Sequence, residues 1–155
     1  MNVIDLFAGV GGLSLGFKQA GFHIVFANEY DESIANSYQK NHKDTVVDTT
    51  SIADLDLDKT FSHYQGNVDV IIGGPPCQGF SQKGNRLGLQ DDRNFMFLKF
   101  FEVVSIVNPK YFLLENVPNI LSSENGFFKN EIIELFNKIG YQITSNTLKA
   151  ENFGV

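Results

Sequence analysis

Short runs of apolar, often β-branched residues alternate along this chain with segments in which apolar residues recur at helical spacing. The runs predict strands over residues 3–7, 23–28, 45–48, 68–72, 111–115 and 141–148. The helical spacing predicts helices over residues 13–20, 32–41, 95–107 and 127–139, whereas residues 51–65 follow neither period clearly. The run at 68–72 is almost entirely apolar, as expected of a strand that is buried on both faces.

The alternation of strands and helices predicts an α/β fold, a doubly wound and mostly parallel sheet with helices on both faces. The 155 residues contain no repeat, low-complexity tract or linker, so we expect a single domain over residues 1–155. In such sheets ligands bind beyond the carboxyl ends of the strands. The residues that follow each predicted strand are therefore the first candidates for function.

The formal net charge of −6, from 12 basic and 18 acidic residues, argues against a nucleic-acid binder, which usually carries a basic patch. The charge is uneven, however: residues 1–76 hold 4 basic and 10 acidic residues, and residues 77–155 hold 8 of each. Both arginines, Arg86 and Arg93, lie in one glycine-bearing stretch of the second part. Arginine suits phosphate binding, although a solvated loop explains the same stretch.

The single cysteine, without metal-type spacing around it, argues against a disulfide framework or a Cys-rich zinc site, and we expect no bound metal. The first residues show no secretion signal, and no apolar run approaches about 18 residues. We therefore expect no membrane segment and a reducing, cytoplasmic setting.

A glycine-rich turn follows the first predicted strand. Gly9, Gly11 and Gly12 permit a tight turn and a close approach of the backbone to a ligand, and the next helix begins directly after them. The spacing G-x-G-G is not the full dinucleotide-binding pattern. The turn is therefore either a nucleotide site or a purely structural connection.

An acidic residue, Glu29, lies 20 residues beyond Gly9 at the end of the second predicted strand. An acidic group at about this distance accepts a ribose hydroxyl in dinucleotide-binding folds. The alternatives for Glu29 are a solvated carboxylate or a helix cap, and Asp31 is itself a plausible N-cap.

Two aromatic residues and a further carboxylate complete this cluster of strand ends. Tyr30 and Phe7 follow the second and first strands and are candidates to sandwich an aromatic base, or else belong to the core. Asp48 ends the third strand, where its carboxylate accepts a hydrogen bond either from an exocyclic amine or from the segment that it caps. Together these strand ends offer the groups that an adenosine moiety needs.

Cys77 and Glu115 follow the fourth and fifth predicted strands. Cys77 comes after two prolines in a loop, whereas a buried structural cysteine lies within an apolar run. Glu115 ends four apolar residues, so we expect it to be partly buried, with its pKa raised by burial. The alternative is a buried Glu115 that accepts hydrogen bonds from backbone amides. If the two strands are neighbours, a thiol nucleophile and a proton-donating carboxylate emerge side by side.

Four motifs, at residues 5–12, 28–31, 75–81 and 115–117, together resemble the cytosine-5 DNA methyltransferase family of bacterial restriction–modification systems. The resemblance implies a Rossmann-like S-adenosylmethionine-dependent fold. Phe7 and the glycine turn would surround the cofactor, Glu29 would bind its ribose, Tyr30 would stack on adenine and Asp48 would hold the adenine amine. The implied cofactor-binding residues are Phe7, Ala8, Gly9, Gly11, Gly12, Glu29, Tyr30, Asp48, Thr49, Pro75 and Met96.

The same resemblance implies catalytic roles for three residues. Cys77 would attack C6 of a cytosine, Glu115 would bind and protonate N3, and Asn116 would support the geometry. The partner would be duplex DNA with a flipped cytosine, because the target atom cannot be reached inside the base stack. The residues of the loop after Cys77 that would contact DNA are Gln78, Ser81, Lys83, Arg86 and Arg93.

Residues 148–155 resemble the approach to a family segment, Gln-x-Arg-x-Arg, that is not in this sequence. We therefore expect residues 141–148 to form an open sheet edge, with the C-terminal part of the sheet and the target-recognition domain missing. The chain alone is expected to be inactive and to need a complementing C-terminal chain. Three alternatives stay open: a non-catalytic S-adenosylmethionine-binding module or split-enzyme subunit, an RNA substrate, and a nicotinamide-dependent oxidoreductase.

Overall fold

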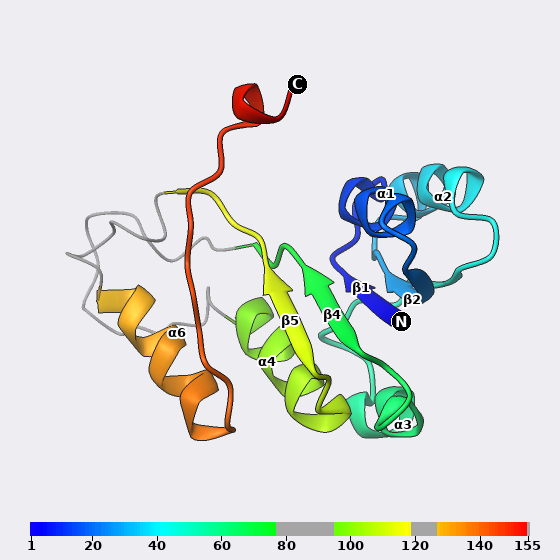
Figure 1. Cartoon of the computed structure of the whole chain (residues 1–155). Helices are drawn as coiled ribbons and strands as arrows, with labels where there is room; N and C mark the ends of the chain where they lie inside the picture. The colour runs from blue at the N-terminus through cyan, green and yellow to red at the C-terminus, as the bar shows by residue number, and fades with distance from the viewer. Residues whose placement is uncertain (77–94, 119–126, 155) are drawn as a thin grey trace, which may run out of the picture.

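The computed structural model describes residues 1–76, 95–118 and 127–154 (Figure 1). Their elements follow one another along the chain in alternating order. They are β1 (Asn2–Leu6), α1 (Gly12–Gln19), β2 (His23–Asn28), α2 (Glu32–Asn41), β3 (Val46–Asp48), α3 (Leu57–Phe61), the 3-10 helix η1 (Ser62–Tyr64), β4 (Val70–Gly73), α4 (Phe95–Val107), β5 (Tyr111–Leu114), α6 (Phe127–Lys138) and the 3-10 helix η5 (Ala150–Phe153).

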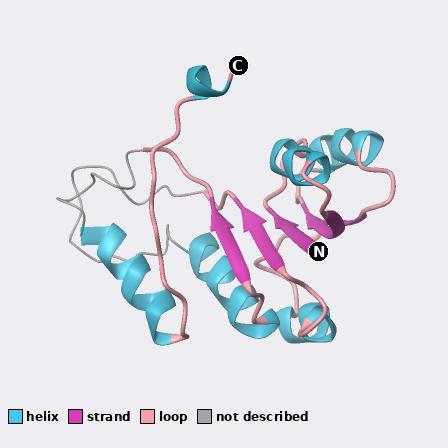
Figure 2. Cartoon of the chain, viewed as in Figure 1, coloured by secondary structure: helices cyan, strands magenta, loops and turns pink. Residues whose placement is uncertain are grey.

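The described strands form a five-stranded sheet in the order β3-β2-β1-β4-β5, and every neighbouring pair is parallel (Figure 2). The chain builds outward from β1 to β3 and then crosses to β4 on the other side of β1. The strand order therefore reverses between β1 and β4, which is where ligands bind in doubly wound sheets. The predicted fold class, a parallel doubly wound α/β sheet, is confirmed.

Alternate residues of the strands supply two cores on opposite faces of the sheet, because successive side chains point to opposite sides. On one face Ile4 and Leu6 pack with buried residues of α3, α4 and α6. On the other face Val3 packs with Leu13 and Phe17 of α1. Each fully buried aliphatic or aromatic side chain contributes about 1.5–3 kcal/mol to folding. Helices cover both faces, as predicted.

An aromatic cluster anchors the β5 end of the first face. The Phe112 and Phe136 rings stack with their centroids 4.1 Å apart, and Tyr141 meets Phe112 edge-to-face at 5.1 Å. The Tyr141 hydroxyl donates a hydrogen bond to the carbonyl oxygen of Pro109 (2.6 Å). This cluster joins α6 and the segment after it to β5.

The predicted strand over residues 141–148 is wrong, because none of these residues has strand structure. Their alternation of apolar and polar residues resembles a strand, but only Tyr141 and Ile143 pack against the core. A strand also requires a hydrogen-bonded partner, and none pairs with this segment among the described residues.

The ambiguous residues 51–65 contain α3 and η1. No helix of the described part is long and apolar enough to cross a membrane.

Candidate cofactor and catalytic site

The turn after β1 has the left-handed backbone that its glycines predict. Phe7, Gly9 and Gly11 have φ angles of 57°, 56° and 89°. The Gly11 amide donates to the carbonyl oxygen of Ala8 (2.9 Å) and closes the turn. Gly11 is also the N-cap of α1, which has neither a side-chain cap nor an acidic residue in its first turn. The first amides of α1 therefore have no side-chain acceptor from the N-cap. Such a helix N-terminus favours the binding of electron-rich groups.

Glu29 is buried, with 8% of its surface exposed, and is therefore not the solvated carboxylate of the alternative interpretation. Its Oε2 accepts a hydrogen bond from the Gly9 amide and its Oε1 from the Asp31 amide, both at 3.0 Å. The cap of α2 is Asp31, as predicted, because its carboxylate accepts from two amides of the first turn. Each Glu29 oxygen has a second lone pair, which leaves acceptor capacity for hydroxyl groups.

Hydrogen bonds join the ends of β1, β2 and β3. The Ala8 amide donates to Asn28 O (3.0 Å), and the Glu29 amide donates to Asp48 O (3.1 Å). The Asn28 side-chain amide donates to the carbonyl oxygens of Asp48 (3.1 Å) and Thr50 (2.9 Å). Asn28 is buried, and no role was predicted for it; a polar residue that ends an apolar run is the signal that identifies it. These bonds bring the first three strand ends into one site.

Asp48 caps the segment that follows it, because its Oδ1 accepts from the Thr50 amide at 2.7 Å. Its Oδ2 has no hydrogen-bond partner in the described part of the chain, so capping and binding an amine are compatible. Tyr30 is 71% exposed, whereas Phe7 is half-buried and packs against the core. Of the two aromatic candidates, Tyr30 has the free ring.

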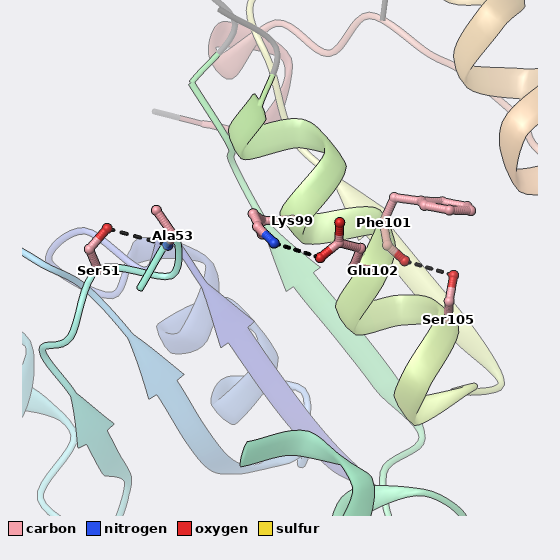
Figure 3. Close-up of polar contacts among 6 residues, drawn as sticks. All are labelled: Ser51, Ala53, Lys99, Phe101, Glu102 and Ser105. Carbon is pink, nitrogen blue, oxygen red and sulfur yellow. Dashed lines mark hydrogen bonds and ion pairs between the residues drawn. The ribbon is translucent and has the colours of Figure 1, made fainter. Parts of the chain in front are cut away.

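Met96 lies in the first turn of α4 and is half-buried against the core. In the same helix the Lys99 ammonium lies 5.1 Å from the centre of the Phe95 ring. Lys99 also pairs with Glu102 at 2.8 Å (Figure 3). In the segment after β3, the Ala53 amide donates to Ser51 Oγ (3.3 Å; Figure 3). Thr49, between β3 and this segment, is exposed.

The ends of β4 and β5 are neighbours, as the catalytic hypothesis requires. The Glu115 amide continues the strand ladder by donating to Gly73 O (2.9 Å). The Asn116 side-chain amide donates to Pro75 O (2.9 Å). A Cβ atom added to Gly74 would lie 3.0 Å from Glu115 Oε2. Glu115 and Asn116 therefore lie against the segment that leads to Cys77.

The expectation that Glu115 is partly buried is wrong, because the side chain is exposed. It follows β5, the last strand of the described sheet, in which alternate side chains such as Leu113 point away from the helices that cover the other face. The predicted residues Cys77, Gln78, Ser81, Lys83, Arg86 and Arg93 lie outside the described residues.

A buried polar network, which sequence reasoning missed, lies beneath α1. Ser14 Oγ donates to Asp5 Oδ2 (2.6 Å), so the Tyr38 hydroxyl is the donor in its 2.7 Å contact with Ser14 Oγ. Burial raises the pKa of Asp5 to about 7, against the hydrogen bonds from Ser14, and raises the pKa of Tyr38 to about 12. The signal for this network is the acidic residue within the apolar run of β1.

His42, at the end of α2, is also buried, and its Nε2 lies 3.1 Å from Gly11 O. Burial lowers its pKa, the charge of Lys18 lowers it further, and the hydrogen bond to Gly11 opposes the shift. Among the described residues, no group of three or more His, Cys, Asp or Glu side chains is arranged to hold a metal ion.

A family model described as C-5 cytosine-specific DNA methylase matches residues 1–155. Similar curated proteins include the type II methyltransferase M.FnuDI of Fusobacterium nucleatum, 40% identical over 155 residues, which are 100% of this chain and 43% of that protein. Another is M1.HphI of Haemophilus parahaemolyticus, 41% identical over 160 residues, covering 100% of this chain and 42% of that protein. The chain thus spans less than half the length of these relatives.

Similar solved structures include a putative DNA modification methyltransferase encoded within an E. coli prophage, with a TM-score of 0.72 and 36% identity over 89% of this chain and 38% of that one. A DNMT2 variant from Spodoptera frugiperda has a TM-score of 0.66 and 27% identity, covering 88% of this chain and 40% of its own. The Dnmt2 methyltransferase of S. pombe, at 22% identity and a TM-score of 0.73, shares the fold.

Proposed function

Because the chain belongs to the C-5 cytosine-specific DNA methylase family, we propose that it is the cofactor-binding and nucleophile-bearing part of an enzyme that methylates C5 of cytosine in DNA. The observation that carries the proposal is the junction of β4 and β5, where Asn116 binds Pro75 two residues before Cys77. The chain covers 43% of M.FnuDI, so the complete reaction would need segments that this sequence does not include.

The site has groups that fit S-adenosylmethionine. The buried Glu29 carboxylate retains acceptor capacity for ribose hydroxyls, the exposed Tyr30 ring offers a stacking surface, and Asp48 Oδ2 offers an acceptor to an exocyclic amine. The residues that would hold the cofactor are Phe7, Ala8, Gly9, Gly11, Gly12, Glu29, Tyr30, Asp48, Thr49, Pro75 and Met96. When bound, the cofactor supplies an electrophilic methyl group for C5.

Cys77 would act as the nucleophile, forming a covalent bond from its sulfur to C6 of the cytosine. The attacking group is the thiolate, and the bond that breaks is the C5–C6 π bond. Glu115 would donate a proton to N3 as the sulfur–C6 bond forms, so that the electron pair of the π bond is held in the ring as an enamine and C5 becomes electron-rich. After C5 is methylated, its proton passes to a base. The sulfur–C6 bond then breaks, the thiolate leaves, the ring regains its C5–C6 double bond and the N3 proton returns to Glu115.

The exposure of Glu115 suits this role, because a group that protonates a substrate base must reach that base rather than the core. A cytosine flipped out of the duplex would cover the carboxylate and exclude water from it. Asn116 would hold the Pro75 carbonyl and thereby orient the approach to Cys77. Gln78, Ser81, Lys83, Arg86 and Arg93 would contact DNA, with the cations at phosphates.

A second candidate function is a non-catalytic S-adenosylmethionine-binding module, or one subunit of a split methyltransferase. Most of the proposed cofactor residues lie within residues 1–76, which the structure describes completely. The proposed setting for either function is the bacterial cytoplasm, and the catalytic one would use C-terminal segments like those of the longer relatives. The two differ in whether Cys77 reacts.

The decisive experiment mixes the chain with S-adenosylmethionine and duplex DNA that carries 5-fluorocytosine, with and without a C-terminal segment of a relative such as M.FnuDI. Fluorine at C5 cannot leave as a proton, so the sulfur–C6 bond would persist as a covalent protein–DNA adduct visible on a denaturing gel. We expect an adduct only with the complement. Cofactor binding without any adduct would instead support the binding module. In a parallel reaction with RNA that carries 5-fluorocytosine, an adduct that DNA does not form would identify RNA as the substrate.

A further inference from the structure

We infer that His42 is a positioning residue for the cofactor site, because its imidazole holds the glycine turn in its binding conformation through Gly11. His42 is at the end of α2 and is not among the residues proposed to touch the cofactor. The inference rests on the cofactor-binding part of the proposed function and adds a residue to that site.

The first observation is a hydrogen bond between distant parts of the chain. His42 Nε2 lies 3.1 Å from the carbonyl oxygen of Gly11, 31 residues away in sequence. The same oxygen accepts the Leu15 amide at 2.9 Å, which is the first backbone hydrogen bond of α1. Because a carbonyl oxygen has two lone pairs, these two donors satisfy it completely. His42 therefore fixes the residue at which the turn becomes a helix.

The second observation is the lack of space between the ring and the turn. A Cβ atom added to Gly11 would lie 2.6 Å from His42 Cδ2 and 2.9 Å from Tyr38 Cδ2. Real Cβ atoms essentially never approach other atoms so closely, and Gly11 also has a φ of 89°. The rings of Tyr38, in α2, and of His42, directly after α2, thus leave room only for glycine at position 11.

The third observation is that the imidazole is itself held in place. The His42 amide donates to Tyr38 O (2.9 Å), and the His42 carbonyl accepts from the Thr45 amide (3.1 Å) and from Gln39 Nε2 (3.1 Å). The ring lies against the Tyr38 ring with centroids 4.4 Å apart, and the Tyr38 hydroxyl is bound to Ser14 of α1. The contacts of His42 with α2 therefore hold its ring in position against the turn.

The protonation state follows from the partners. Gly11 O can only accept, so Nε2 carries the proton, and the buried Nδ1 has no hydrogen-bond partner in the described part of the chain. Burial lowers the pKa of His42 and the charge of Lys18 lowers it further, against the hydrogen bond to Gly11, so the balance favours the neutral ring. The contact itself needs only the proton on Nε2.

The consequence for the cofactor site is direct. If Gly11 moved, the first turn of α1 would move with it, and Gly9 would lose its alignment with Glu29 Oε2. Both the helix amides and the proposed ribose-binding carboxylate would then be displaced. Pre-organisation of this kind increases affinity because the ligand does not have to order the loop.

The test compares three variants of the chain. His42→Leu replaces the imidazole with an apolar side chain and so removes the donor. His42→Gln retains an amide donor close to the position of Nε2. His63→Leu changes an exposed histidine and is the matched control. Calorimetry measures the Kd for S-adenosylmethionine. We expect His42→Leu to raise the Kd at least tenfold, and the Gln and control variants to stay within about threefold of the unmodified chain.

A second measurement does not depend on the ligand. Amide hydrogen exchange, followed by NMR, should accelerate at least tenfold at Gly9, Gly11 and Leu15 in His42→Leu, with no comparable change at Ile4 in the centre of β1. An equal acceleration at Ile4 would mean that His42 serves the whole fold, and would overturn the positioning role. If His42→Leu does not fold, His42→Ala replaces it with the same expected results.

The two proposals fail in different ways. If the unmodified chain does not bind S-adenosylmethionine, the proposed function fails for this chain, and the exchange data alone then decide whether His42 holds the turn. If the unmodified chain binds the cofactor and His42→Leu changes neither the Kd nor the exchange at the turn, the inference about His42 is wrong and the proposed function stands.

Discussion

Glu29 Oε2 accepts the Gly9 amide at 3.0 Å, so a carboxylate at the end of β2 closes the glycine turn that follows β1. Its other oxygen accepts the Asp31 amide, at the start of α2, also at 3.0 Å. One buried side chain therefore links three elements of the proposed cofactor site. A role in stability and a role in binding are both built into this residue, and they can be separated by mutation.

Glu29→Ala is expected to raise the Kd for S-adenosylmethionine at least tenfold and to lower the free energy of unfolding by about 1–3 kcal/mol, because two partly buried amides lose their acceptor. Glu29→Gln keeps one acceptor oxygen, so its Kd and its free energy of unfolding should lie between those of the unmodified chain and those of Glu29→Ala. Calorimetry and urea unfolding measure the two effects, with the exposed Glu32→Ala as control. Binding of NAD by the unmodified chain, weakened equally by Glu29→Ala, would support the oxidoreductase alternative instead.

The buried carboxyl of Asp5 makes stability depend on pH. Burial raises its pKa from 3.8 to about 7 in the folded chain, so the folded state holds a proton that the unfolded state has released. This stabilisation is complete below pH 3.8 and is lost as the pH rises through 7. Between pH 5 and 7 the loss is on the order of 2 kcal/mol.

Asp5→Asn removes that titration while keeping the shape of the side chain. Urea unfolding at several pH values should therefore show that the free energy of unfolding falls more steeply with pH in the unmodified chain than in the variant, since the other groups contribute equally to both. If the two chains keep the same slope between pH 5 and 7, Asp5 does not titrate in this range.

Cys77→Ser is expected to leave the Kd for S-adenosylmethionine unchanged within about twofold and to abolish the covalent adduct with 5-fluorocytosine DNA in the complemented enzyme. The physical reason is that a serine hydroxyl has a far higher pKa than a thiol and is a poor nucleophile without an adjacent base. A collapse of cofactor binding in this variant would identify Cys77 as a structural residue.

Asn116→Ala removes the side-chain donor to Pro75 O and should slow adduct formation at least tenfold, because the approach to Cys77 loses its tie to β5. The Kd for the cofactor should not change, since the residues that hold it lie mainly at β1, β2 and β3. Single-turnover kinetics with the complemented enzyme provides the rate, and calorimetry provides the affinity. Unchanged adduct kinetics would remove Asn116 from the positioning machinery.

Much of the fold could be predicted from the sequence because the relevant signals are local. The apolar runs of β1, β2 and β4 and the spacing of α2 and α4 gave predicted ranges that agree with the observed elements to within two residues. The glycine turn and the Asp31 cap involve residues only a few positions apart. The motifs around Cys77 and Glu115 also identified the family, which the match over residues 1–155 confirms.

The tertiary structure alone decided the contacts between distant segments. The His42–Gly11 and Tyr38–Ser14 contacts span 31 and 24 residues, and the Asn116–Pro75 hydrogen bond spans 41. The tertiary structure also explains two wrong predictions. Glu115 is exposed because it follows the last described strand, and residues 141–148 have no partner among the described residues with which to form a strand. The physical reason is the same in each case. Propensity and capping depend on near neighbours in sequence, whereas burial and hydrogen-bond partners depend on which elements the folded sheet brings together.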